Sequence, residues 1–309
     1  MKRIGIALGG GGAKGFAHIG VIKALRKKEE FLPSIIAGTS AGSIVATLYA
    51  SGLAQSKLEE SAMEFDWFHD VINLMDTAKL IVGRKMGGLL SNASLGKTIN
   101  ELIEGRGFND LETELAIVAT DIENRRRVIF TSERTAKNIN REELLRFLPE
   151  PEPENSKPGF STLVISDFED IGKAVQASCA VPGVFQPVEI GGMKLLDGGL
   201  VDQIPVDVVR AMGAEVTIGV SLALATIRER ISNPMDAAGS VLGILGLHQV
   251  RRSLDLADIG FQISGIEKRS SINPKQYELL QLGESEMERH IKALELILEI
   301  HNKEEIDMR

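Results

Sequence analysis

Ser40 is the candidate nucleophile of this sequence because of the residues that surround it. It lies in the pentapeptide Gly38–Gly42, which has the form Gly-x-Ser-x-Gly. The apolar residues Ile35–Ala37 before it predict a strand, and Ala41–Ser51 after it predict a helix. A serine at such a turn has a strained backbone and an exposed hydroxyl, and the flanking glycines avoid collisions with the neighbouring strand or helix. The pattern predicts a nucleophile elbow, although Gly-x-Ser-x-Gly also occurs by chance and in ordinary turns.

A glycine run, Gly9–Gly15, follows a strand predicted at Lys2–Leu8 and opens a helix predicted at Ala13–Lys28. Its successive backbone N–H groups could form an oxyanion hole, because no side chain blocks them. The run also satisfies Gly-x-Gly-x-x-Gly, the dinucleotide fingerprint, with Glu29 and Glu30 at a tolerable distance for a ribose contact. The nearby elbow favours the oxyanion hole, because a dehydrogenase does not need a nucleophile.

A serine nucleophile needs a base, and an aspartate is a better candidate than any histidine. The chain order of α/β-hydrolases would select His248, but this residue lies in an apolar helical stretch that favours a packing or surface role. Asp197 follows the strand predicted at Met193–Leu196 and precedes Gly198 and Gly199. A strand end with glycines suits a site residue, although Asp-Gly by itself is also an ordinary turn.

Other motifs give no cofactor or metal. Residues 91–98 end in Gly-Lys-Thr like a phosphate-binding loop, but they begin with serine and no strand precedes them. No cluster of His, Asp and Glu has the spacing of metal ligands. We therefore expect neither a metal nor a cofactor.

Composition narrows the class of protein. The 309 residues are 43% hydrophobic, as in ordinary globular domains, and carry a formal net charge of −8, which argues against a nucleic-acid partner. This net charge does not exclude a membrane surface as a partner, because a small basic patch can act locally. Cys179 is the single cysteine, so an intrachain disulfide is ruled out and a reducing compartment is expected. Without a signal peptide or an apolar run of about 20 residues, we expect a cytoplasmic protein that is at most peripheral to a membrane.

The order of predicted elements indicates an α/β protein. The β-α-β-α opening predicts a parallel sheet covered by helices. Further strands are predicted at Leu115–Asp121, Arg127–Thr131, Leu163–Ser166, Met193–Leu196 and Glu215–Ser221, and long helices near residues 234–256 and 274–300. The polar, proline-rich residues 132–162 predict a mobile flap or disorder.

Four segments in one order resemble the patatin-like phospholipases: Gly10–Gly15, Gly38–Gly42, Ala177–Pro187 and Asp197–Gly199. The resemblance covers about residues 4–220 and implies a three-layer α/β/α fold with a mainly parallel sheet. The implied catalytic domain is 4–210, with a flexible insertion near 132–162, and 211–309 complete the same domain. The implied roles are nucleophile for Ser40, general base for Asp197, oxyanion hole for Gly10, Gly11 and Gly12, and motif support for Lys14, Gly15, Gly38, Gly42, Gly198 and Gly199.

The resemblance implies a lipid acyl hydrolase with a Ser–Asp dyad and an acyl-serine intermediate. The substrate would be a phospholipid or another fatty-acyl ester, and partial burial should raise the pKa of Asp197 enough for it to act as a base. An acyltransferase or thioesterase using the same dyad is the alternative, and a Rossmann-type nucleotide-binding protein is a remote one. Gln203 and Lys14 stand where the family commonly has asparagine and arginine.

Residues 80–90 mix apolar side chains with Arg84 and Lys85 between glycines. This segment could border an acyl channel or meet a bilayer surface. A buried helix end followed by a turn explains the same residues equally well. Oligomeric state and lipid preference are not indicated by the sequence.

Overall fold

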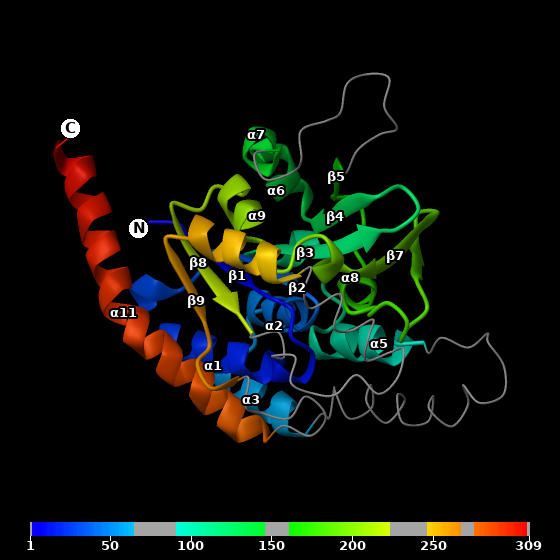
Figure 1. Ribbon diagram of the computed structural model, residues 1–309, viewed down its shortest axis with the longest axis horizontal. Helices are drawn as coiled ribbons and strands as arrows, with labels where there is room; N and C mark the ends of the chain where they lie inside the picture. Colours follow the sequence, from blue (N-terminus) through cyan, green and yellow to red (C-terminus); the bar gives the residue numbers. More distant parts are fainter. Residues whose placement is uncertain (1, 65–90, 146–160, 223–245, 267–274, 308–309) are drawn as a thin grey trace.

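A computed structural model describes residues 2–64, 91–145, 161–222, 246–266 and 275–307. Its centre is one sheet in the order β5-β4-β3-β2-β1-β8-β9, with β7 also paired to β3 and β6 to β7 (Figure 1). The pairs β3–β4, β3–β7 and β6–β7 are antiparallel, and the other described pairs are parallel. The strands are β1 (Ile4–Leu8), β2 (Ile35–Thr39), β3 (Glu114–Asp121), β4 (Arg126–Thr131), β5 (Ser161–Ile165), β6 (Val188–Ile190), β7 (Met193–Asp197), β8 (Val216–Ser221) and β9 (Ile259–Gln262).

Helices cover both faces of this sheet (Figure 1). Side chains alternate along the strands, so in β1 Ile6 and Leu8 join one apolar core while Ala7 joins the other. The predicted three-layer α/β/α fold with a mainly parallel sheet is confirmed. Residues 246–256 are also helical. The remaining helices are α1 (Phe16–Leu25), α2 (Ala41–Ala50), α3 (Gln55–Glu64), α5 (Ala93–Leu102), α6 (Glu133–Asn138), α7 (Arg141–Leu145), α8 (Ile171–Ser178), α9 (Val206–Ala211) and α11 (Gln276–Asp307).

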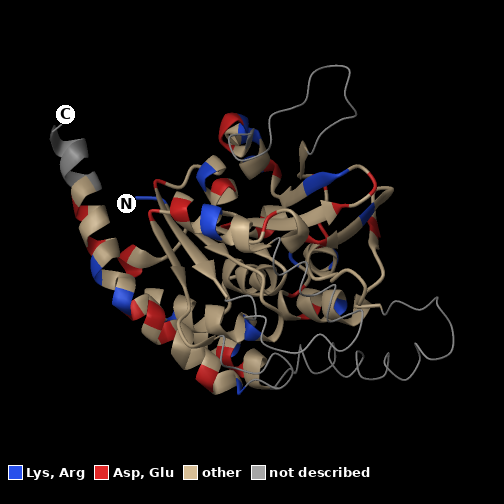
Figure 2. Ribbon diagram, in the orientation of Figure 1, with Lys and Arg blue, Asp and Glu red and all other residues tan. Residues whose placement is uncertain are grey.

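The long helix α11 packs closely along α1 at one side of the molecule (Figure 1). A Cβ on Gly20 of α1 would lie 1.9 Å from the carbonyl oxygen of Leu280, and a Cβ on Gly283 of α11 would lie 1.8 Å from that of Ala17. These two glycines therefore permit the contact between the helix backbones. Beyond it, Lys23 of α1 and the following Lys27 and Lys28 form ion pairs with Glu284, Glu288 and Glu295 of α11. Figure 2 marks the Lys, Arg, Asp and Glu positions along these elements.

The described parts of the segment 132–162, for which the composition predicts a mobile flap or disorder, form regular elements; residues 146–160 lie outside the described residues. Helices α6 and α7 occupy 133–138 and 141–145, and β5 begins at Ser161. The Ser132 hydroxyl caps α6 by accepting the N–H of Thr135 at 3.2 Å. Leu144 of α7 is buried in the core that includes α9. A cap and a few buried contacts are enough to fix short helices in a polar stretch.

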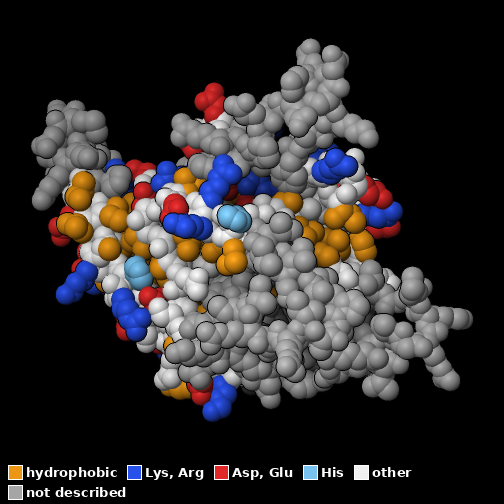
Figure 3. All heavy atoms as spheres, viewed as in Figure 1, with side chains coloured by type: hydrophobic (Ala, Val, Ile, Leu, Met, Phe, Trp, Pro, Cys, Tyr) orange, Lys and Arg blue, Asp and Glu red, His pale blue; other side chains and the backbone are white. Residues whose placement is uncertain are grey.

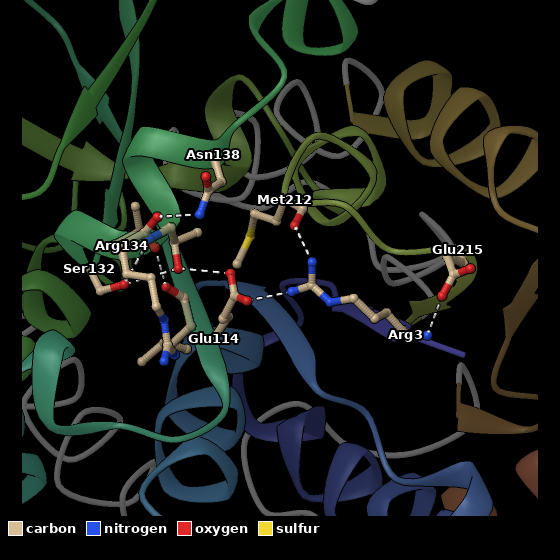
Figure 4. Close-up of polar contacts among 10 residues, drawn as sticks. Arg3, Glu114, Ser132, Arg134, Asn138, Met212 and Glu215 are labelled. Atoms are coloured by element: carbon tan, nitrogen blue, oxygen red, sulfur yellow. Dashed lines mark hydrogen bonds and ion pairs between the residues drawn. The ribbon is translucent and has the colours of Figure 1, made fainter. Parts of the chain in front are cut away.

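Polar contacts at the amino end of β3 also hold α6 (Figure 4). Glu114 accepts the hydroxyl of Thr135 at 2.9 Å and pairs with the guanidinium of Arg3. Arg3 donates in addition to the carbonyl of Met212 at 3.4 Å, and its backbone N–H donates to Glu215 at 2.8 Å. The network therefore joins α6 to β1, β3 and the segment between α9 and β8. The network lies at the amino ends of these parallel strands.

Among the described helices, none is both long enough and apolar enough to cross a bilayer. On the face in Figure 3, the described Lys and Arg side chains lie among Asp and Glu. The segment 80–90, predicted to border an acyl channel or a membrane surface, lies outside the described residues.

Candidate active site

Ser40 lies at the turn between β2 and α2. Its backbone angles, φ 52° and ψ −125°, are rare for a residue with a side chain, and such strain costs about 1–3 kcal/mol. Two glycines make the turn possible: a Cβ on Gly42 would lie 2.0 Å from the carbonyl oxygen of Leu8, and one on Gly38 would lie 2.4 Å from that of Gly42. The serine therefore begins α2 from a fixed turn, where the helix dipole favours negative charge.

Hydrogen bonds on both sides of Ser40 hold the strained backbone. Its N–H donates to the hydroxyl of Ser178 at 2.9 Å, and that hydroxyl donates to the carbonyl of Val118 at 2.6 Å. Its carbonyl accepts the hydroxyl and the N–H of Ser43 at 2.6 Å and 2.8 Å. The elbow is thereby tied to α8 and β3. Sequence reasoning gave Ser178 no role, because nothing in its local pattern indicates a partner 138 residues away.

The register of the sheet brings Asp197 to the same place. β2 ends at Thr39, which pairs with Val118 of β3, and β7 ends at Asp197, which pairs with the next residue, Ala119. Because β2 runs parallel to β3 and β7 runs antiparallel to it, the carboxyl ends of β2 and β7 meet along one side of β3. The serine that follows β2 and the aspartate that ends β7 therefore lie together.

Asp197 is a buried carboxyl group whose pKa is raised to about 6, because burial disfavours its charged form. Two hydrogen bonds lower the pKa in part. One involves the Ser40 hydroxyl, and in the other the N–H of Gly199 donates to Oδ1 at 2.8 Å. Its backbone carbonyl accepts the Thr120 hydroxyl, and its N–H donates to the carbonyl of Ala180, both at 2.9 Å. A carboxylate with this pKa can accept a serine proton more readily than an ordinary aspartate.

Cys179 is a buried neutral thiol in contact with this pair. Burial and the charge of Asp197 raise the pKa of its thiol, while the hydroxyls of Ser43 and Ser40 lower it in part. Its Sγ lies 3.9 Å from the Ser43 Oγ. Because the Ser43 hydroxyl already donates to the Ser40 carbonyl, the thiol is the donor in this contact. Because its raised pKa disfavours the thiolate, Cys179 is a poor candidate nucleophile.

The glycine run Gly9–Gly15 lies between β1 and α1 and is called the glycine loop below. It lies beside Ser40, since a Cβ on Gly10 would be 3.3 Å from the Ser40 Cβ. Gly10 is buried, and its N–H donates to the carbonyl of Gln203 at 3.1 Å. Gly11 is half-buried and Gly12, with φ 57°, is exposed. Neither of their N–H groups donates to an acceptor in the described part of the chain. Of the three predicted oxyanion-hole residues, Gly11 and Gly12 thus offer an N–H, whereas that of Gly10 is engaged.

The described histidine side chains have other settings. His18 of α1 is fully buried, its Nε2 donates to the carbonyl of Gly9 at 2.8 Å, and burial lowers its pKa to about 4. His248 is exposed on the helix 246–256, and His290 of α11 stacks on Phe261. The aspartate therefore remains the favoured base.

The dinucleotide interpretation of the glycine loop lacks its ribose contact. Glu29 and Glu30 lie in the turn Glu29–Phe31 after α1. A helix of this length places them roughly 15 Å along its axis from the loop. In the part of the chain that the structure describes, no group of three His, Cys, Asp or Glu side chains could hold a metal ion.

Comparisons with known proteins agree with the motifs. The family model described as patatin-like phospholipase matches residues 6–210. An uncharacterized NTE family protein of Mycobacterium tuberculosis is 28% identical over 220 residues, 71% of this chain and 49% of the relative. Human patatin-like phospholipase domain-containing protein 6 is 26% identical over 222 residues, 71% of this chain and 13% of that protein. The chain thus spans about half, or less, of these relatives. A chain of the Pseudomonas aeruginosa ExoU–SpcU complex aligns with a TM-score of 0.48 at 16% identity, over 94% of this chain and 51% of that one.

Proposed function

The chain belongs to the patatin-like phospholipase family, and we propose that it is a serine-dependent lipid acyl hydrolase with Ser40 as nucleophile and Asp197 as general base. The observation that carries this proposal is the register on β3, where the ends of β2 and β7 pair with adjacent residues. A strained serine thereby faces a buried carboxyl group with a pKa of about 6. Strain and a buried charge both destabilise a fold, so their coincidence supports a catalytic purpose.

In the proposed cycle, the Ser40 Oγ attacks the ester carbonyl carbon while its proton passes to Asp197. The oxyanion accepts hydrogen bonds from the N–H groups of Gly11 and Gly12, and the N-terminus of α2 favours its charge. Asp197 then gives the proton to the leaving alkoxide, which leaves an acyl-serine. In the second half, Asp197 takes a proton from water, the hydroxide attacks the acyl group, and the fatty acid departs as Ser40 regains its proton.

The substrate class that we propose is a phospholipid or another fatty-acyl ester. Membership of the family supports this class. An acyltransferase or a thioesterase would use the same acyl-serine and differ in the acceptor or the acyl donor. Products formed from a p-nitrophenyl acyl ester with and without an added alcohol separate transfer from hydrolysis.

A fluorophosphonate probe is expected to label Ser40 and no other serine. The phosphonyl group mimics the tetrahedral adduct, so reaction requires an activated serine next to an oxyanion hole. Mass spectrometry of the digested protein locates the adduct. Ser40→Ala should abolish labelling, whereas Ser91→Ala, which removes an exposed serine before α5, should leave it unchanged. A folded wild-type protein with no adduct on Ser40 would contradict the proposed function.

The activity is expected to depend on one ionisation near pH 6. Asp197 must be deprotonated to act as a base, so kcat/KM falls as the pH drops below its pKa of about 6. The slope should be about tenfold per pH unit on the acid side, with a level region above pH 7. Rates with a p-nitrophenyl ester in buffers from pH 4.5 to pH 8.5 give the profile, and circular dichroism verifies the fold at each pH. An inflection above about pH 8, or a flat profile, would require another base.

A further inference from the structure

Gln203 contacts the glycine loop at two points. Its backbone carbonyl accepts the N–H of Gly10 at 3.1 Å, and its side-chain Nε2 donates to the carbonyl of Gly10 at 3.2 Å. The side chain is buried. Because the partner of the amide is a carbonyl oxygen, the nitrogen and not the oxygen of the amide must face the loop.

The same side chain lies against the turn that follows the proposed base. A Cβ on Gly199 would be 2.4 Å from the Gln203 Oε1 and 3.1 Å from the Asp197 Oδ1. A Cβ on Gly10 would be 3.0 Å from the Gln203 Nε2 and 3.3 Å from the Ser40 Cβ. Gln203 is therefore packed between the glycine loop and the Asp197 turn, beside both groups of the dyad.

Because a peptide unit is planar, the contact of the Gly10 carbonyl with Gln203 also fixes the direction of the Gly11 N–H. The carbonyl of Gly10 and the N–H of Gly11 belong to one trans peptide unit and point in opposite directions. Holding that carbonyl on Gln203 therefore turns the Gly11 N–H away from Gln203. Glycines have little intrinsic preference for one backbone conformation, so an unheld loop could flip this peptide and present an oxygen in place of the N–H.

The neighbouring peptides are held in the same way. The carbonyl of Gly9 accepts the Nε2–H of His18 at 2.8 Å, and the N–H of the same peptide unit is the Gly10 donor to Gln203. On the other side, the carbonyl of Gly11 accepts the N–H of Lys14 at 3.3 Å, which orients the N–H of Gly12. Only the Gly10–Gly11 unit owes its orientation to a side-chain amide next to the dyad.

We infer that Gln203 is a positioning residue that holds the Gly10–Gly11 peptide with its N–H toward the oxyanion. This inference rests on the proposed function, because an oxyanion forms only in acyl transfer. Gln203 touches neither the substrate carbonyl nor the nucleophile's proton in this role. Its contribution appears when charge develops on the substrate oxygen, so it should act on kcat and leave KM nearly unchanged.

Gln203→Met tests this role, because methionine keeps the length of the side chain and lacks the donor. With a p-nitrophenyl acyl ester we expect kcat to fall about 10- to 100-fold and KM to change less than about twofold. The matching thionoester provides a second readout, because sulfur accepts hydrogen bonds weakly. The rate ratio of ester to thionoester should fall in the variant, since less stabilisation of the oxyanion remains to be lost.

The controls separate positioning from general damage. Gln249 also donates its side-chain amide to a backbone carbonyl, that of Leu200 at 3.3 Å, which lies in the turn after Asp197 and not in the glycine loop. Gln249→Met should therefore keep both kcat and the ratio. Gln203→Glu, which replaces the donor by an acceptor of the same shape, should lose at least as much kcat as Gln203→Met, and it carries the test if the methionine variant does not fold.

The outcomes distinguish this inference from the proposed function. If the wild type is active with labelled Ser40 and both Gln203 variants match it, the inference is wrong and the proposed function stands. An equal loss with ester and thionoester would also overturn it, because a merely structural role moves both rates together. If the folded wild type hydrolyses no ester and Ser40 takes no label, both fail.

Discussion

Asp197→Asn is expected to lower kcat about 10²–10⁴-fold while the protein stays folded. Asparagine has nearly the same shape, and its amide oxygen can still accept the N–H of Gly199, which the carboxylate accepts at 2.8 Å. It cannot accept the proton of Ser40, so nucleophilic attack and the later activation of water both lose their base. Initial rates with a p-nitrophenyl ester at pH 8 measure the effect.

Asp170→Asn is the matched control for this substitution. Asp170 also accepts a backbone N–H, that of Lys173 at 2.8 Å, but it caps the end of α8 opposite to Ser178. Asparagine caps helices as well as aspartate does, so full activity is expected. If Asp197→Asn kept wild-type kcat, the base would have to be sought elsewhere, beginning with Asp202.

Asp197→Asn is also expected to stabilise the fold at pH 8. Burial raises the pKa of Asp197 from 3.8 to about 6, so the folded state binds this proton more tightly than the unfolded state. The ionised carboxylate therefore lowers the free energy of unfolding above about pH 6, by at most about 3 kcal/mol, and this penalty disappears as the pH falls toward 4. Urea unfolding should show a gain for the asparagine variant at pH 8 and a much smaller gain at pH 4. A variant less stable than wild type at pH 8 would contradict a destabilising charge.

Local patterns were sufficient to predict the elbow but not the arrangement around it. A strand, two glycines and a helix are all encoded within a few residues of Ser40, so turn chemistry predicts its position. Asp197 carried only an Asp-Gly signal, and its meeting with Ser40 depends on β7 pairing antiparallel with β3 beyond the end of β2. That pairing is a tertiary choice that no local spacing specifies.

The hydrogen-bond partners of the site escaped prediction for the same reason. The sequence suggests Gly10, Gly11 and Gly12 as the oxyanion hole, whereas in the fold the N–H of Gly10 donates to the carbonyl of Gln203. In the sequence, Gln203 stands out only as a departure from the family pattern. The positioning role that we infer for it depends on a contact with Gly10, which lies 193 residues away in the sequence. Composition alone does not indicate the helices α6 and α7, because a cap and tertiary contacts fix them.

Arg127→Met is expected to lower the free energy of unfolding by about 3–5 kcal/mol at pH 8. The Arg127 Nη1 donates to Asp202 Oδ2 and Asp207 Oδ2, both at 2.7 Å, and all three residues are buried. Removing the guanidinium leaves two carboxylates in the interior without an opposite charge. Methionine retains much of the apolar volume of the arginine stem, so the loss is mainly electrostatic. Urea unfolding of the variant and the wild type measures it.

Arg127→Met should lower the activity of the site in addition to the stability of the fold. The carbonyl of Asp202 accepts the hydroxyl of Thr39, the residue before Ser40, at 2.9 Å. Arg127 also donates to the carbonyl of Leu144 at 3.4 Å, which ties α7 to the same cluster. We therefore expect esterase activity to fall in Arg127→Met, by less than in Asp197→Asn, because the dyad itself keeps both members.

A triple variant and a change of pH separate lost charge from lost packing. Burial and the charge of Asp207 raise the pKa of Asp202 to about 7 even with Arg127 present. In Arg127→Met the folded protein should therefore take up protons readily, and its deficit should shrink as the pH falls from 8 to 5.5. Adding Asp202→Asn and Asp207→Asn removes both charges and should recover most of the stability at pH 8. A deficit that is equal at both pH values and persists in the triple variant would mean that Arg127 acts by filling space, since neither proton uptake nor charge removal relieves a packing defect.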